Sequence, residues 1–282
     1  MELHFTATEE KRLSALLKED MGVSTGLMNK LKWQDKLFVN GIPQRTNYMV
    51  AAGDVVTVPL DEEMPRYPAE EGDLTILYED EHILAVDKPA GMLIHPSRSA
   101  FTGTLANRVL GYYQKTGQNC AFHPITRLDR DTFGIVLLAK NAHIHALLNQ
   151  LHTQGAIQKI YHARVSGGPE EEQGIIDAPI ARRPLPSLLR YVNQNGKPSV
   201  TKYRVLEQSD GVSLLELTPV TGRTHQLRVH CAYMGYPILG DPQYGTEAAK
   251  IYAPSQLLCA KKLIFPHPVT KKPLTLESKL NV

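Results

Sequence analysis

The first 60 residues carry a helical hydrophobic pattern followed by a strand pattern. Three leucines lie on one face of a helix predicted over about residues 8–19, and Thr6 and Glu9 have the spacing of a capping box. Ser24 can cap a second short helix. Two strand patterns follow, at residues 36–39 and 53–58, and the first of them turns at an Asn-Gly pair. The pattern predicts a compact module over residues 1–60.

The rest of the chain begins with a segment that has no hydrophobic period. Residues 61–73 are acidic and contain two prolines, which is typical of a linker. A helix is predicted from Asn141 to Leu151, and strands are predicted at residues 74–78, 82–87, 134–139, 159–165, 200–207 and 212–218. Successive strands with few helices favour an α+β domain over residues 74–282, built on a largely antiparallel mixed sheet with flanking helices and loops.

Composition narrows the class of protein. A chain of 282 residues with 42% hydrophobic and 21% charged residues is globular rather than disordered. The N-terminus lacks the pattern of a signal peptide, and no apolar run approaches the ~18 residues of a spanning helix, so we expect a cytoplasmic protein without membrane association. The three cysteines are far apart in sequence, and the histidines do not have metal-ligand spacing. We therefore expect no metal, and no obligate protein partner is evident.

The charge is unevenly distributed along the chain. A net charge of +2 is small for a nucleic-acid-binding protein. Between residues 178 and 206, however, there is no acidic residue, and the basic residues are Arg182, Arg183, Arg190, Lys197, Lys202 and Arg204. A solvated loop is one interpretation. We favour an arm that contacts phosphate groups, because three prolines prevent a continuous helix here.

One aspartate stands out as a candidate for catalysis. Asp129 lies between Arg127 and Arg130, just before the apolar run at residues 135–139. Neighbouring cations favour the ionised form of a carboxylate, and the predicted strand would anchor it. A structural aspartate in a turn is the simpler alternative.

The segments around this aspartate resemble the RluA family of RNA pseudouridine synthases. The resemblance covers about residues 72–282 and rests on motif blocks that occur in the order and spacing of that family. The blocks are residues 77–96, 123–140, 159–167, 222–230 and 240–245.

This resemblance implies an enzyme that isomerises uridine to pseudouridine in folded RNA without a cofactor. It implies that Asp129 acts at the target nucleotide and that Arg223 pairs with it. Tyr161 would stack on the uracil, although a buried core tyrosine is the alternative. Arg127 would enter the RNA stack as the nucleotide leaves it, and Arg130 is a further RNA contact. The segment with His225 and Arg228, and the turn at residues 240–245, would support the site.

The N-terminal module resembles the small RNA-binding unit first named for small-subunit ribosomal protein four. In that family the second helix and the following loop face RNA. Here this region offers Lys30, Lys32 and Arg45 as RNA contacts. A purely structural N-terminal cap is the alternative.

The chain departs from the RluA pattern at two positions beside Asp129. The family usually has His where this chain has Thr126 and Ser where it has Phe133, so the bulky ring would alter the packing of the loop. These departures motivate a competing hypothesis, a non-catalytic RNA-binding or ribosome-assembly protein on the same fold. A glycosidase or nucleosidase is disfavoured because sugar hydrolysis usually needs two carboxylates. By analogy, ribosomal RNA is favoured over transfer RNA as the partner.

Overall fold

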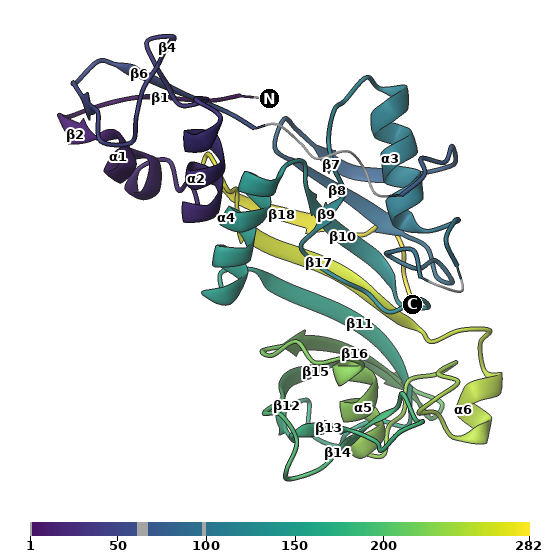
Figure 1. The fold of residues 1–282 in the computed structure, drawn as a ribbon. Helices are drawn as coiled ribbons and strands as arrows, with labels where there is room; N and C mark the ends of the chain where they lie inside the picture. Colours follow the sequence, from purple (N-terminus) through teal and green to yellow (C-terminus); the bar gives the residue numbers. More distant parts are fainter. Residues whose placement is uncertain (1, 61–66, 98–99) are drawn as a thin grey trace.

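A computed structural model of the chain describes residues 2–60, 67–97 and 100–282 and shows a small N-terminal module beside a larger body built on one long sheet (Figure 1). The elements of the module are β1 (Glu2–Thr6), β2 (Lys11–Arg12), α1 (Leu13–Glu19), α2 (Thr25–Trp33), β3 (Phe38–Val39), β4 (Ile42–Pro43), β5 (Met49–Val50) and β6 (Val55–Pro59). Four of its strands form a sheet in the order β1-β6-β3-β4 around a separate hydrophobic core.

The module agrees with the sequence pattern in its second half and differs in its first. The side chain of Ser24 accepts a hydrogen bond from the Leu27 amide at 3.2 Å and caps α2, as predicted. Asn40 and Gly41 have φ values of 50° and 76° and connect β3 to β4, as the predicted hairpin requires. The first helix begins at residue 13 rather than 8, because residues 11 and 12 form β2 and pair with β5. The predicted capping box is therefore wrong.

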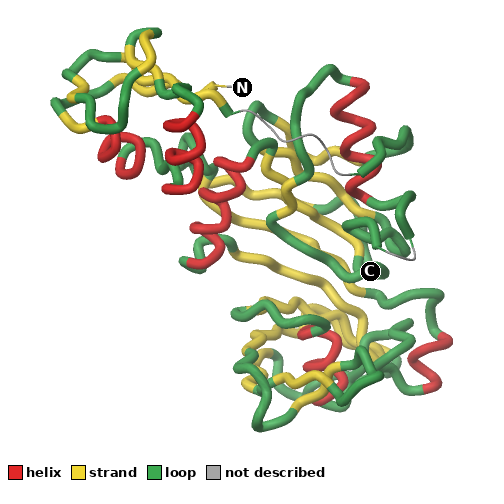
Figure 2. Tube along the Cα trace, in the orientation of Figure 1, coloured by secondary structure: helices red, strands yellow, loops and turns green. Residues whose placement is uncertain are grey.

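The body contains the remaining elements. They are β7 (Thr75–Glu79), β8 (Ile83–Lys88), α3 (Leu105–Lys115), β9 (His123–Pro124), β10 (Phe133–Ala139), α4 (Ala142–Thr153), β11 (Gln158–Ser166), β12 (Gln173–Asp177), β13 (Ile180–Arg182), β14 (Arg190–Val192), β15 (Val200–Ser209), β16 (Val212–Pro219), α5 (Gln226–Tyr233), α6 (Glu247–Ile251), β17 (Leu258–Pro266) and β18 (Pro273–Glu277). Strands outnumber helices clearly (Figure 2).

The main sheet has the order β12-β15-β16-β11-β17-β10-β8-β7, with β18 paired to β17 and β9 paired to β10. Among the described strands only β10 and β17 pair in parallel. The predicted α+β class with a largely antiparallel mixed sheet is confirmed. The predicted strands and the helix capped by Asn141 are present, with ends shifted by one or two residues.

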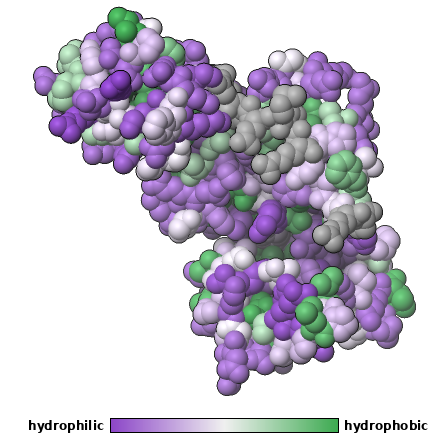
Figure 3. All heavy atoms as spheres, viewed as in Figure 1, coloured by the Kyte–Doolittle hydropathy of each residue, from purple (hydrophilic) through white to green (hydrophobic). Residues whose placement is uncertain are grey.

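Helices cover both faces of the sheet around β10. Alternate residues of β10 pack with α4 on one face and with α3 on the other, which explains why this strand is apolar at every position. In the other half, α5 packs on β11 and β16. Long strands such as β11 run from one half to the other (Figure 1), and the surface is hollowed between the halves (Figure 3).

The predicted linker is described only in part, since residues 61–66 lie outside the described residues. The following residues lie against α3: the Glu70 amide donates to the Asn107 carbonyl at 2.9 Å, and the Asn107 side chain donates to the Pro68 carbonyl at 2.8 Å. Residues 67–73 are thus attached to the body. On the other side, the turn at Gly22 packs against Leu147 of α4. None of the described helices combines the length and the apolar character needed to cross a bilayer.

Candidate active site

A cleft of about 810 Å³ lies between the two halves of the main sheet. Its walls come from the loop between β9 and β10, one face of α4, the start of β11 and the segment at residues 219–228. Asp129, Arg127, Tyr161 and Arg223 all line it. These residues from three predicted motif blocks are therefore brought together at one site.

The buried Lys88 fixes the backbone of the loop that carries Asp129. The ammonium group of Lys88 donates hydrogen bonds to the carbonyl groups of Pro89 at 2.9 Å, Met92 at 2.8 Å and Arg130 at 2.8 Å. Burial lowers the pKa of Lys88 to about 8, although the nearby charges of Asp131 and Asp129 act in the opposite direction. The lysine is used here as an anchor for the loop backbone.

The two ends of this loop are fixed by further contacts. The Thr126 hydroxyl accepts a hydrogen bond from the Leu137 amide at 3.0 Å, and the Gln256 side chain donates to the Thr132 hydroxyl at 2.6 Å. At Gly134 the backbone has a φ of 105°, and a Cβ atom would lie 2.4 Å from the Ala260 carbonyl oxygen of β17. Only glycine allows β10 to approach β17 this closely directly after the loop.

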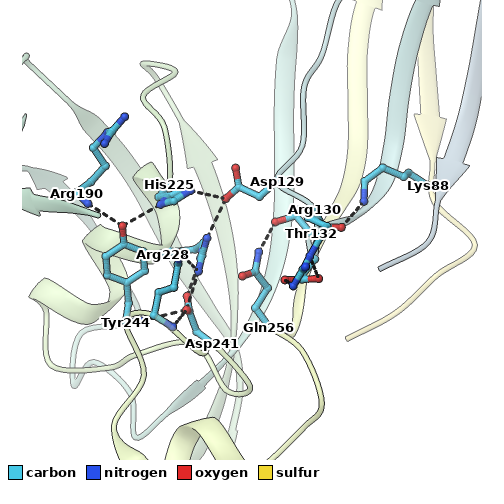
Figure 4. Close-up of polar contacts among 12 residues, drawn as sticks. Lys88, Asp129, Arg130, Thr132, Arg190, His225, Arg228, Asp241, Tyr244 and Gln256 are labelled. Carbon is cyan, nitrogen blue, oxygen red and sulfur yellow. Dashed lines mark hydrogen bonds and ion pairs between the residues drawn. The ribbon is translucent and has the colours of Figure 1, made fainter. Parts of the chain in front are cut away.

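The arginine that contacts Asp129 is not the predicted one. The guanidinium of Arg228 donates to Asp129 Oδ2 at 3.2 Å (Figure 4), whereas Arg223 donates to the Pro198 carbonyl at 3.1 Å and is exposed. The predicted pairing of Asp129 with Arg223 is therefore wrong. The physical reason is the start of α5: Arg223 precedes the helix, while Arg228 is its third residue and points into the protein.

Arg228 is itself held by a buried carboxylate. Its Nε and Nη2 atoms donate to the two oxygens of Asp241 at 2.7 and 2.8 Å, and Nη2 also donates to Gln243 at 2.9 Å. The side chain of Asp241 is 0% exposed and that of Arg228 is 5% exposed. Burial opposes both charges, but their mutual hydrogen bonds dominate, so the pKa of Arg228 is raised and the pKa of Asp241 is lowered. The pair stays charged and fixes the orientation of the guanidinium.

Tyr161 lies on the same face of β11 as Ala163 and Val165. It packs against the same hydrophobic cluster as Ala163 and Val165 and also lines the cleft. The register of β11 on β17 shifts between Ile160 and Tyr161, and such a bulge redirects a side chain. Burial and the charge of Asp129 raise the pKa of the Tyr161 hydroxyl, so this group is neutral at pH 7.

Of the two departures from the family pattern, only one touches the cleft. Thr126 is buried and lines the cleft wall. Phe133 is buried in β10 and is not one of the residues that line this cleft. Its ring is therefore buried away from the cleft.

The predicted RNA contacts fall into three groups. Arg127 is exposed at the cleft, whereas the exposed Arg130 forms a two-contact ion pair with Asp131 at 3.0 and 3.1 Å. The hairpin of β13 and β14 carries Arg182, Arg183 and Arg190. The N-terminal module exposes Lys30, Lys32 and Arg45.

A histidine and a tyrosine complete the surroundings of Asp129. His225 Nε2 lies 3.9 Å from Asp129 Oδ2, and its Nδ1 atom lies 2.9 Å from the Tyr244 hydroxyl. Arg228, His225 and Asp241 belong to the motif blocks at residues 222–230 and 240–245. From the sequence only supporting roles were expected for these residues, because the approach of His225 and Arg228 to Asp129 depends on how α5 is oriented.

The site consists of a carboxylate paired with a buried guanidinium, in an open cleft across a mixed sheet. Together with the fold, this arrangement indicates an enzyme. The family model for RNA pseudouridylate synthase matches residues 82–233. The chain belongs to this family and is of the RluA type that its motifs predicted.

Relatives in several bacteria match most of the chain. An uncharacterized RNA pseudouridine synthase of Bacillus subtilis is 36% identical over 264 residues, which is 93% of each chain. Ribosomal large subunit pseudouridine synthase C of Vibrio cholerae is 32% identical over 288 residues, 96% of this chain and 90% of that protein. Synthase D of Nitrosomonas europaea is 39% identical over 221 residues, 76% of this chain and 64% of that protein.

Solved structures agree with the fold. Human RNA pseudouridylate synthase domain containing 1 superposes with a TM-score of 0.63 at 24% identity, covering 76% of this chain and 92% of that one. Human RNA pseudouridylate synthase domain containing 4 gives a TM-score of 0.60 at 26% identity, covering 73% and 88%.

Proposed function

We propose that this protein isomerises specific uridines to pseudouridine in structured ribosomal RNA and that Asp129 acts at the target nucleotide. The observation that carries the proposal is the position of Asp129 in the cleft, in contact with Arg228. The buried Asp241 accepts hydrogen bonds from the same arginine and fixes its orientation. The names of the relatives from Vibrio cholerae and Nitrosomonas europaea, which specify the large ribosomal subunit, support the choice of RNA.

The reaction breaks the bond between N1 of uracil and the sugar, turns the base and forms a bond from C5 to the same sugar carbon. An ionised carboxylate is required at the nucleotide, and the guanidinium of Arg228 keeps Asp129 oriented toward the cleft. The neutral ring of Tyr161 offers a face on which uracil can stack while it is detached. These steps need no cofactor.

RNA would approach over basic side chains at the rim of the cleft. Arg127 is exposed at the cleft beside Asp129, and it would occupy the space that an extruded nucleotide leaves. The hairpin of β13 and β14 adds three arginines, and Leu185 and Leu188 between these strands are 77% and 68% exposed. Arg223, although it does not pair with Asp129, lines the cleft and offers a further contact for phosphate.

The N-terminal module would form a second RNA-binding surface, similar to the unit of small-subunit ribosomal protein four. Supporting this, the module has its own core, and α2 exposes Lys30, Lys32 and Trp33. Trp33 is 84% exposed, and the Lys32 ammonium lies 5.8 Å from the centroid of its ring. An exposed aromatic ring beside cations suits stacking on an unpaired base.

The test is the release of tritium from ribosomal RNA labelled at C5 of uracil, because C5 exchanges its hydrogen for the sugar carbon. We expect release by the wild-type protein and none by Asp129→Asn, with RNA binding retained in both. Asp131→Asn is the matched control, since Asp131 lies in the same loop and pairs with Arg130. Binding without tritium release by the wild-type protein would instead support the non-catalytic hypothesis.

A further inference from the structure

The hydroxyl of Tyr244 links two parts of the structure that are far apart in sequence. It accepts a hydrogen bond from the backbone amide of Arg190 in β14 at 2.9 Å and lies 2.9 Å from Nδ1 of His225 (Figure 4). In the part of the chain that the structure describes, this hydroxyl has no acceptor within reach except the His225 ring. Because the phenol oxygen already accepts from the Arg190 amide, the hydroxyl is placed to donate its single proton to Nδ1.

With Tyr244 as the donor, His225 has a defined tautomer. A neutral imidazole that accepts at Nδ1 carries its proton on Nε2. Nε2 is the atom that faces Asp129 Oδ2 at 3.9 Å. The ring also packs edge-on against Tyr244, with centroids 5.7 Å apart and an interplanar angle of 73°.

The backbone of His225 is unusual as well. Its φ of 57° and ψ of 20° place it in the left-handed region, immediately before α5. Non-glycine residues adopt this conformation at an energetic cost, and such positions cluster at functional sites. Here the conformation brings the ring back toward the cleft instead of leaving it on the helix surface.

We propose that His225 is a positioning residue for the catalytic carboxylate, held by Tyr244 as the tautomer whose Nε2 proton points at Asp129 Oδ2. Arg228 contacts the same oxygen at 3.2 Å. The two nitrogen atoms therefore approach the same carboxylate oxygen, which leaves Oδ1 to face the nucleotide. The proposal rests on the proposed function of Asp129.

The surrounding charges agree with a neutral ring. The charged groups that face it are Asp129, Arg228, Arg190 and Asp241. Burial and the two arginines hold the pKa of His225 below its ordinary value, while the two carboxylates act in the opposite direction. Because Arg190 belongs to the basic hairpin, the same contacts connect the proposed RNA arm to Asp129.

The tautomer can be measured without any assay of activity. Nitrogen-15 NMR of the full chain labelled at histidine distinguishes protonated from unprotonated ring nitrogens, and the His225 signals are those that disappear in His225→Gln. At pH 7 we expect a neutral ring with the proton on Nε2, and a shift toward the other tautomer in Tyr244→Phe. A proton on Nδ1, or a charged ring, in the wild-type protein would overturn the proposal.

Single-turnover tritium release then tests the role. We expect His225→Leu to lower the rate constant roughly tenfold, because Asp129 loses the polar group that faces Oδ2, with little change in RNA affinity. His225→Gln, which keeps a donor of similar reach, should recover part of this loss. If the wild-type protein is active and His225→Leu, still folded, stays within about twofold of it, the positioning role is wrong. If the wild-type protein is inactive, the proposed function fails, and the NMR result still decides the tautomer.

Discussion

Replacing Arg228 by lysine should impair catalysis far more than the same change at Arg223. The guanidinium of Arg228 contacts Asp129, both oxygens of Asp241 and Gln243 at 2.7 to 3.2 Å. A lysine ammonium keeps the charge but has no planar fork, so it cannot reach Asp241 and Asp129 together. The contact with Asp129 would be lost.

The size of the effect follows from that one contact. A hydrogen bond to a charged group contributes about 1.5–3 kcal/mol, and each 1.36 kcal/mol corresponds to about a tenfold change in rate. Because the Asp129 side chain is 31% exposed, solvent screens part of this interaction, and we expect a loss nearer the lower end, about 10- to 100-fold. The rate constant for tritium release under single-turnover conditions measures it.

Arg223→Lys is the matched control, because the Arg223 side chain donates to the Pro198 carbonyl and lysine keeps its charge. We expect it to stay within about threefold of the wild-type rate. Urea denaturation of both variants separates loss of folding from loss of function. Equal impairment of the two variants, or full activity of a folded Arg228→Lys, would refute the reasoning.

Three further outcomes are expected. Lys88→Met leaves three loop carbonyl groups without a donor, so urea denaturation should show a free energy of unfolding that is lower by about 3 kcal/mol or more. The rate of tritium release should fall as well, and an unaltered rate would contradict the anchoring role. Burial lowers the pKa of His143 from 6.5 to about 4, so its neutral form stabilises the fold above pH 6.5 and this stability is lost as the pH falls toward 4. Between pH 7 and pH 5 the wild-type protein should lose about 2 kcal/mol more unfolding free energy than His143→Gln, and equal losses would argue against a buried neutral ring. Trp33 is the single tryptophan of the chain, so its fluorescence should be quenched by ribosomal RNA at low salt; unchanged emission at saturating RNA would remove the stacking role.

Local sequence patterns predicted the structure correctly where a few neighbouring residues determine it. Asn40 and Gly41 have the positive φ values that an Asn-Gly hairpin turn requires, and the helix predicted from Asn141 begins directly after that residue. The apolar run of β10 is buried on both faces, and it was recognisable as a strand for that reason. The motif blocks likewise identified the family and brought Asp129 and Tyr161 forward as candidates.

The start of α1 shows where local patterns fail. Its leucines lie on one face as predicted, and the helix still begins later because β2 pairs with β5, which lies far along the chain. Pairing energy from a distant strand outweighed a capping box of two exposed side chains. The residues around the start of α1 do not indicate that β2 will pair with a distant strand.

The sequence by itself determined which residues are available for the chemistry: a carboxylate with cations beside it, a strand tyrosine and a block with two arginines. The tertiary structure alone decided which arginine meets the carboxylate. Arg223 and Arg228 lie only five positions apart, but α5 begins between them and turns Arg228 toward Asp129 and Asp241. Distances between side chains from separate loops depend on how helices and strands pack, and that packing is a property of the whole chain.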